Sequence, residues 1–209
     1  MIRLRVRAAA ITPDDLAPAV SALRRDGVVA FPTETFYGLA VDPRSAPAVQ
    51  AVFHLKRRGR DQPLPLIASG LDQIIDHVGT LTPLGERLAS RVWPGPLTLI
   101  IPASPRLCED VHLSTGKVAV RISADPVARA LAHSAGHAIT STSANISGDP
   151  PASTADHVAA SFGAAIDVLI DGGDTPAGLP STIIDVTGDT PVLVRAGAVP
   201  WERVLEFSN

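Results

Sequence analysis

The feature that most constrains the fold of this chain is the irregular order in which short apolar runs and capped helical segments follow one another. Short apolar runs are typical of buried strands, whereas apolar residues at helical spacing after a capping residue indicate helices. Strands are expected at residues 2–6, 28–31, 64–68, 97–101, 118–122, 137–140, 166–170, 181–186 and 192–194. Helices are expected at 12–25, 45–59, 71–78 and 82–93, from 125, from 153, and at 201–207. Because this order is not a regular alternation, the sequence predicts an α/β fold around a twisted mixed sheet flanked by helices.

The composition is that of an ordinary globular chain. Its 209 residues, 45% of them hydrophobic, are enough to bury a core in one domain, or in one domain with a small elaboration. A formal net charge of -3 gives no global electrostatic case for nucleic acid or an anionic membrane surface, so any basic site must be local. A single cysteine excludes an internal disulfide framework. With no apolar run of membrane-spanning length and no signal-peptide pattern, a cytoplasmic protein is expected.

Lys56 is one of only two lysines among eighteen basic residues and stands beside Arg57, Arg58 and Arg60. In the helix that begins at residue 45 it continues the apolar stripe of Val49, which predicts that its side chain leaves toward the core and reaches a cleft at the helix end. The alternative is a lysine of the last turn that complements the helix dipole and extends into solvent. Gly59 is expected to end this helix.

Two polar segments follow buried strands. The turn Thr33-Glu34-Thr35 stands at the end of a strand, where α/β proteins bind ligands, although ordinary turn hydrogen bonding also explains its hydroxyls. If the chain stays extended from Ser141 to Ser147, the side chains of alternate residues share one face and offer neutral donors to phosphate, ribose or base. A simple Asx or Ser turn is the alternative reading of this second segment.

Arg121 lies inside an otherwise apolar strand and therefore requires an anionic partner. That partner is either an internal carboxylate or the carboxylate of a substrate. The connection at residues 171–180, rich in glycine and proline, is suited to covering a site. A basic helix end and a hydroxyl-rich loop together favour a nucleotide or another polyanion as ligand.

Several other chemistries are excluded by their spacing. The chain has no Walker-type phosphate loop, no zincin histidine pair and no G-x-S-x-G motif. Cys108 stands beside Glu109 and Asp110, which raise the pKa of a thiol and argue against a reactive thiolate.

Seven sequence blocks together resemble the signature of the YrdC-like family, the threonylcarbamoyl-AMP synthases. They stand in the family's order and cover nearly the whole chain. The blocks are residues 31–39, Lys56-x-Arg58, residues 93–98, residues 118–121, residues 143–148, residues 180–185 and Arg195-x-Gly197. The chain departs from the family's usual pattern at Gly59, Gln62 and Ile67.

This resemblance implies one YrdC-like domain over residues 1–209, with a large concave basic cleft, in the single-domain form of the family. The implied reaction joins L-threonine, bicarbonate and ATP into threonylcarbamoyl-adenylate with release of pyrophosphate, for threonylcarbamoylation of tRNA adenosine 37. Mg²⁺ is expected to arrive through the ATP phosphates, with no metal ligand from the protein. A downstream tRNA threonylcarbamoyl transferase is the expected partner, and a direct contact with tRNA is left open.

The resemblance also implies the residues of the site. Lys56, Arg58, Ser143 and Asn145 match catalytic positions. The ATP-binding positions are Lys56, Arg58, Gln62, Lys117, Ser141, Ser143, Asn145 and Arg195. Those that hold threonine are Thr35, Arg121 and Ser181. Two other functions remain as alternatives, an RNA-binding protein that uses the basic cleft and a carbamoyl-adenylate-forming relative with another acceptor.

Overall fold

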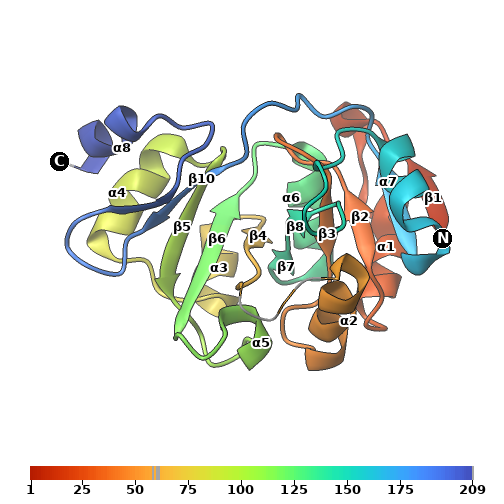
Figure 1. The fold of residues 1–209 in the computed structure, drawn as a ribbon, viewed down its shortest axis with the longest axis horizontal. Coiled ribbons are helices and arrows are strands. Elements are labelled where there is room, and N and C mark those ends of the chain that lie inside the picture. Colours follow the sequence, from red (N-terminus) through yellow and green to blue (C-terminus); the bar gives the residue numbers. More distant parts are fainter. Residues whose placement is uncertain (58, 60–61, 209) are drawn as a thin grey trace.

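The computed structural model describes residues 1–57, 59 and 62–208, and it confirms a mixed α/β fold flanked by helices. The strands form two mixed sheets, where the sequence analysis expected one (Figure 1). The five-stranded sheet has the order β1 (Ile2–Arg5), β9 (Val168–Asp171), β2 (Val29–Phe31), β3 (Gly38–Ala40) and β8 (Thr142–Ser143). The six-stranded sheet has the order β11 (Val192–Arg195), β10 (Thr182–Asp185), β5 (Leu97–Pro102), β6 (Lys117–Ile122), β4 (Leu66–Ala68) and β7 (Ile139–Thr140).

Strands distant in the chain pair in both sheets. In the first, β9 runs parallel to both β1 and β2, and β3 pairs antiparallel with β2 and β8. In the second, β10 runs parallel to β5 and β4 runs parallel to β6, while the remaining pairs are antiparallel. The division into two sheets therefore depends on these long-range pairings, which local patterns do not specify.

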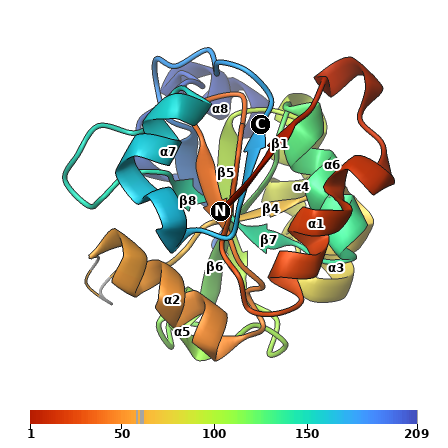
Figure 2. The ribbon, with the colours of Figure 1, turned by 90° about the vertical axis from the view of Figure 1, so that its right-hand side faces the viewer.

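The helices cover the outer flanks of the sheets. They are α1 (Pro13–Leu23), α2 (Ala46–Lys56), α3 (Leu71–His77), α4 (Pro83–Val92), α5 (Glu109–His112), α6 (Pro126–Ala135), α7 (Ala155–Phe162) and α8 (Trp201–Ser208), with 3-10 turns at Ala8–Ala10 and Gly163–Ala165. Of these, α1, α2, α4, α6 and α7 each begin after a residue whose side chain caps the first turn. Figure 2 shows α1 and α6 together on one flank and α2 and α7 on the opposite flank. Among the described residues, no helix is both long and apolar enough to cross a membrane.

An apolar cluster under α1 and α6 joins the two sheets. Leu16 of α1 and Leu131 of α6 pack with Phe31 of the first sheet and with Ile67 and Ile139 of the second, and all five are fully buried. Burial of each such side chain contributes roughly 1.5–3 kcal/mol relative to exposure. This cluster packs the two sheets against each other on one flank, and Ile67 belongs to it and not to the cavity described below.

The end of α2 differs from the expectation. The helix ends at Lys56, not at Gly59, because Arg57 takes the left-handed conformation at φ 50° and its N–H bonds back to the carbonyl of His54 at 3.0 Å. An arginine therefore fills a position that is more often glycine. The turn places the chain exit immediately after Lys56.

Candidate functional site

One cavity of about 780 Å³ opens between the two sheets. Its walls come from the β2–β3 turn, from β8 and the residue before it, from β5, β6, β10 and β11, and from the loops at residues 62–65 and 178–181. Seven of the eleven residues predicted from the sequence line it, namely Thr35, Gln62, Arg121, Ser141, Ser143, Ser181 and Arg195. The fold thus brings residues from distant parts of the chain to one place.

The β2–β3 turn is held rigid by the hydroxyl of Thr33. Its Oγ1 donates to the carbonyl oxygen of Phe36 at 2.7 Å and accepts from the N–H groups of Thr35 and Phe36 at 3.1 and 3.3 Å. Both readings of this turn therefore hold, because Thr33 makes the turn hydrogen bonds and the side chains of Thr33 and Thr35 both line the cavity.

The connection at residues 171–180 lies against this turn. The N–H of Ala177 donates to the carbonyl oxygen of Thr35 at 3.2 Å, and the hydroxyl of Tyr37 donates to that of Gly173 at 2.7 Å. Gly178 and Pro180 line the cavity. The connection therefore forms one side of the cavity, as expected of a covering segment.

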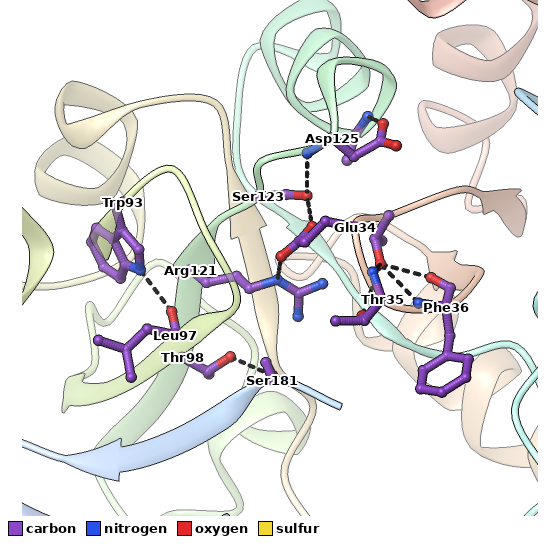
Figure 3. A network of polar contacts seen from close by, with 12 residues as sticks. Glu34, Thr35, Phe36, Trp93, Leu97, Thr98, Arg121, Ser123, Asp125 and Ser181 are labelled. Atoms are coloured by element: carbon purple, nitrogen blue, oxygen red, sulfur yellow. Dashed lines mark hydrogen bonds and ion pairs between the residues drawn. The ribbon is translucent and has the colours of Figure 1, made fainter. Parts of the chain in front are cut away.

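Arg121 has an internal carboxylate as its partner. Its Nε lies 3.1 Å from Glu34 Oε1, and the arginine side chain is 6% exposed (Figure 3). Burial lowers the pKa of Arg121, and the negative charge of Glu34 opposes that shift. Because Arg121 also lines the cavity, a ligand carboxylate remains a candidate second partner.

Ser181 connects two strands through its hydroxyl and its carbonyl. Arg195 Nη2 donates to Ser181 Oγ at 3.0 Å and to its carbonyl oxygen at 2.7 Å, and Ser181 Oγ lies 2.9 Å from Thr98 Oγ1. Burial and the positive charge of nearby Arg121 lower the pKa of Arg195. Two arginines that repel each other at one cavity wall favour an anion as ligand.

Lys56 is 2% exposed, which confirms that its side chain leaves α2 on the core side. Its Nζ donates to the carbonyl oxygens of Ser143 and Asn145 at 2.5 and 2.8 Å and to Asn145 Oδ1 at 3.1 Å. The N–H of Ser147 in turn donates to the carbonyl oxygen of Lys56 at 2.9 Å. Lys56 therefore holds the start of the loop through its ammonium group and the end of the loop through its carbonyl oxygen.

The hydroxyl-rich loop is extended only as far as Ser143. Of the two readings of this loop, the turn is the one found, because the chain bends at Ala144 and Asn145 so that two carbonyls reach one ammonium group. Asn145 stabilises that turn, since its Oδ1 accepts from Ser143 Oγ at 2.6 Å and its Nδ2 donates to the carbonyl oxygen of Asp149 at 2.6 Å. Ser143 lines the cavity and Asn145 stands behind it.

The remaining predicted residues lie elsewhere. Lys117, at the start of β6, is outside the cavity lining and pairs with Asp185 at 2.9 Å. Arg58 falls outside the described residues, so its assignment stays a prediction. Burial, followed by the charge of Asp110, raises the pKa of Cys108, in agreement with an unreactive thiol.

Two residues that contact the predicted threonine-binding residues were missed by sequence reasoning. Glu34 and Thr98 both stand inside the sequence blocks but were given no role. The signal for Glu34 was present, because a buried arginine requires a carboxylate and Glu34 is the acid of the polar turn. Thr98 had no such signal, since a threonine in a strand is common.

This fold and this cavity define an α/β protein with an arginine-lined cavity between two mixed sheets. A family model described as "Sua5_yciO_yrdC: Telomere recombination" matches residues 21–197, and the chain belongs to this Sua5/YrdC family.

Several proteins of known name are similar to the chain. A threonylcarbamoyl-AMP synthase of Thiobacillus denitrificans is 43% identical over 174 residues, which are 83% of this chain and 91% of that protein. One of Bacillus subtilis is 38% identical over 90% of this chain and 55% of that protein. The structure of Pyrococcus abyssi Sua5 complexed with L-threonine matches with a TM-score of 0.90 at 38% identity, over 99% of this chain and 60% of that one. The chain thus spans little more than half the length of the last two relatives.

Proposed function

We propose that this chain synthesises threonylcarbamoyl-adenylate from L-threonine, bicarbonate and ATP, with release of pyrophosphate, for threonylcarbamoylation of tRNA adenosine 37. The observation that carries the proposal is that residues assigned to ATP and residues assigned to threonine line the same cavity. The names of the similar proteins support the same reaction and favour it over an RNA-binding function.

The proposed chemistry needs no protein nucleophile. The amine of threonine reacts with bicarbonate to form a carbamate and water. A carbamate oxygen then attacks the α-phosphorus of ATP, forming a P–O bond as the bond to the leaving pyrophosphate breaks. Catalysis is therefore a matter of positioning the reactants and stabilising negative charge.

The described side chains fit these tasks. Arg121 presents a guanidinium for the threonine carboxylate, and the hydroxyls of Thr35 and Ser181 are placed in the same cavity to orient the amino acid. Arg195 supplies positive charge toward the nucleotide. Lys56 acts at least through the loop that it holds, which presents Ser143 to the cavity.

Mg²⁺ would come with ATP. Among the described residues there is no group of three or more His, Cys, Asp and Glu that could hold a metal ion, whereas phosphate oxygens are good Mg²⁺ ligands. When bound, Mg²⁺ would neutralise charge on the phosphates. We propose a cytoplasmic location, with a tRNA threonylcarbamoyl transferase as the consumer of the adenylate.

The test is pyrophosphate release by the purified chain in reactions that omit threonine, bicarbonate or ATP in turn. Release is expected only when all three are present. Release that is independent of threonine would refute the proposal. As a site test, Arg121→Lys keeps the charge but loses the planar fork and is expected to raise KM for threonine about 10- to 100-fold. The matched control is Arg203→Lys on α8, which pairs with Glu206 on the surface and should leave KM unchanged.

A further inference from the structure

A set of polar contacts centred on Glu34 connects the two sheets beside Arg121. Glu34 belongs to the β2–β3 turn of the five-stranded sheet, whereas Arg121 and Ser123 belong to β6 and its exit in the six-stranded sheet. Glu34 Oε1 lies 3.1 Å from Arg121 Nε, and Glu34 Oε2 accepts a hydrogen bond from Ser123 Oγ (Figure 3). The glutamate side chain is 13% exposed. Both carboxylate oxygens of Glu34 therefore contact residues of the six-stranded sheet, although the backbone of Glu34 belongs to the five-stranded one.

This ion pair engages only one part of the guanidinium. Because Ser123 takes the second oxygen of Glu34, the carboxylate does not make the two-pronged contact that arginine usually offers. Figure 3 shows the two Nη atoms of Arg121 projecting away from Glu34. Arg121 lines the cavity and Glu34 does not. The pair therefore leaves the outer N–H groups of Arg121 directed toward the cavity side.

The position of Glu34 is itself fixed from the start of α6. Ser123 Oγ accepts from the N–H of Asp125 at 3.1 Å, and the carbonyl oxygen of Ser123 accepts from Arg129 Nη1 at 2.6 Å. Asp125 caps α6 by accepting from the N–H of Val127 at 2.8 Å. Hydrogen bonds thus connect the start of α6 to Glu34, and the ion pair of Glu34 connects them to the cavity-facing arginine.

We propose that Glu34 is the positioning residue for Arg121, holding its Nε so that the outer N–H edge of the guanidinium binds the carboxylate of an amino-acid substrate. The identity of that substrate as L-threonine rests on the function proposed above, whereas the positioning of Arg121 does not. If Glu34 acted on Arg121 only through its negative charge, the expectation would be the opposite. Removal of that charge would then strengthen the binding of an anion by Arg121.

Three variants separate orientation from charge. Glu34→Gln keeps an oxygen beside Arg121 Nε without the charge, and Glu34→Ala removes both the oxygen and the charge. Glu206→Ala, which removes a carboxylate from the surface pair with Arg203, is the matched control. In calorimetric titrations with L-threonine, the alanine variant is expected to weaken binding about tenfold or more and the glutamine variant less than about threefold. The affinity for ATP is expected to stay unchanged in all three.

Two titration results would overturn the proposal. One is unaltered or tighter threonine binding in Glu34→Ala, and the other is a glutamine variant as weak as the alanine variant. If Glu34→Ala does not fold, Ser123→Ala removes the second contact of Glu34 and leaves the charges in place. It is then expected to weaken threonine binding by about three- to tenfold, and unchanged binding would count against the positioning role.

A second measurement does not depend on the ligand. The Nε–H resonance of Arg121, identified in an ¹⁵N spectrum by its loss in Arg121→Lys, is expected to exchange slowly with water in the wild type. Exchange should become fast in Glu34→Ala and stay slow in Glu34→Gln and Glu206→Ala. An unchanged resonance in Glu34→Ala overturns the positioning role. If the wild type does not bind threonine, the proposed function is refuted. The exchange rate of the Arg121 resonance still tests the positioning role of Glu34 in that case.

Discussion

Lys56→Met tests whether the buried ammonium group holds the loop that faces the cavity. Methionine keeps the length and apolar stem of lysine but removes the donor to Ser143 and to Asn145. Hydrogen bonds to a charged group contribute about 1.5–3 kcal/mol each, and the substitution also removes the cost of burying the charge, so we expect a net loss of about 2–4 kcal/mol. For a chain of this size that lowers Tm by roughly 4–16 °C.

The chain's other lysine provides the control for stability. Lys117 pairs with Asp185 at the surface, with the two side chains 45% and 21% exposed, so Lys117→Met should cost less than about 1 kcal/mol. Thermal unfolding followed by circular dichroism compares the two variants. Pyrophosphate release is then measured below both transition temperatures, where Lys56→Met is expected to be inactive. Equal Tm values for the two variants would refute the reasoning.

Two further predictions concern a hydroxyl pair and a histidine. Thr98→Val removes the hydroxyl 2.9 Å from Ser181 Oγ and is expected to raise KM for threonine about three- to tenfold without changing KM for ATP; equal changes in both would contradict it. Burial lowers the pKa of His137 despite Asp42 at 3.4 Å, so the folded protein keeps the imidazole neutral while the unfolded chain takes up a proton below about pH 6.5. The free energy of unfolding should therefore be highest above that pH and decrease below it, and it should depend less steeply on pH in His137→Gln. The measurement is urea unfolding at a series of pH values, and the same pH dependence in both proteins would refute this.

The starts of α1, α6 and α7 were predictable because a local signal marks them, whereas the short helix α5, which has no side-chain cap, was not expected. The Oγ1 of Thr12 caps α1 together with Asp15, Asp125 caps α6, and Thr154 caps α7, each as a short polar side chain before an apolar repeat. The core-facing direction of Lys56 followed from the same helical period. These features depend on residues only a few positions apart.

Features that depend on distant contacts were not predictable. The strand β3 is only three residues long and follows the polar turn, and it forms because β2 and β8 pair on its two sides. The turn at Asn145 exists because the ammonium of Lys56, far away in sequence, collects two carbonyls. A carboxylate partner for Arg121 could be expected from its burial. That this partner is Glu34 depends on how the two sheets pack, which the sequence does not specify.

The parallel pairing of β1 with β9 has a consequence for the order of events during synthesis. Ile2 pairs with Val168 and Arg5 with Asp171, so β1 is synthesised long before β9, which comes last in the chain among the strands of its sheet. Until then β1 and β2 lack the strand that lies between them. An unpaired strand edge invites pairing with other chains. The arginines at positions 3 and 5 place charge on that waiting strand and oppose such association.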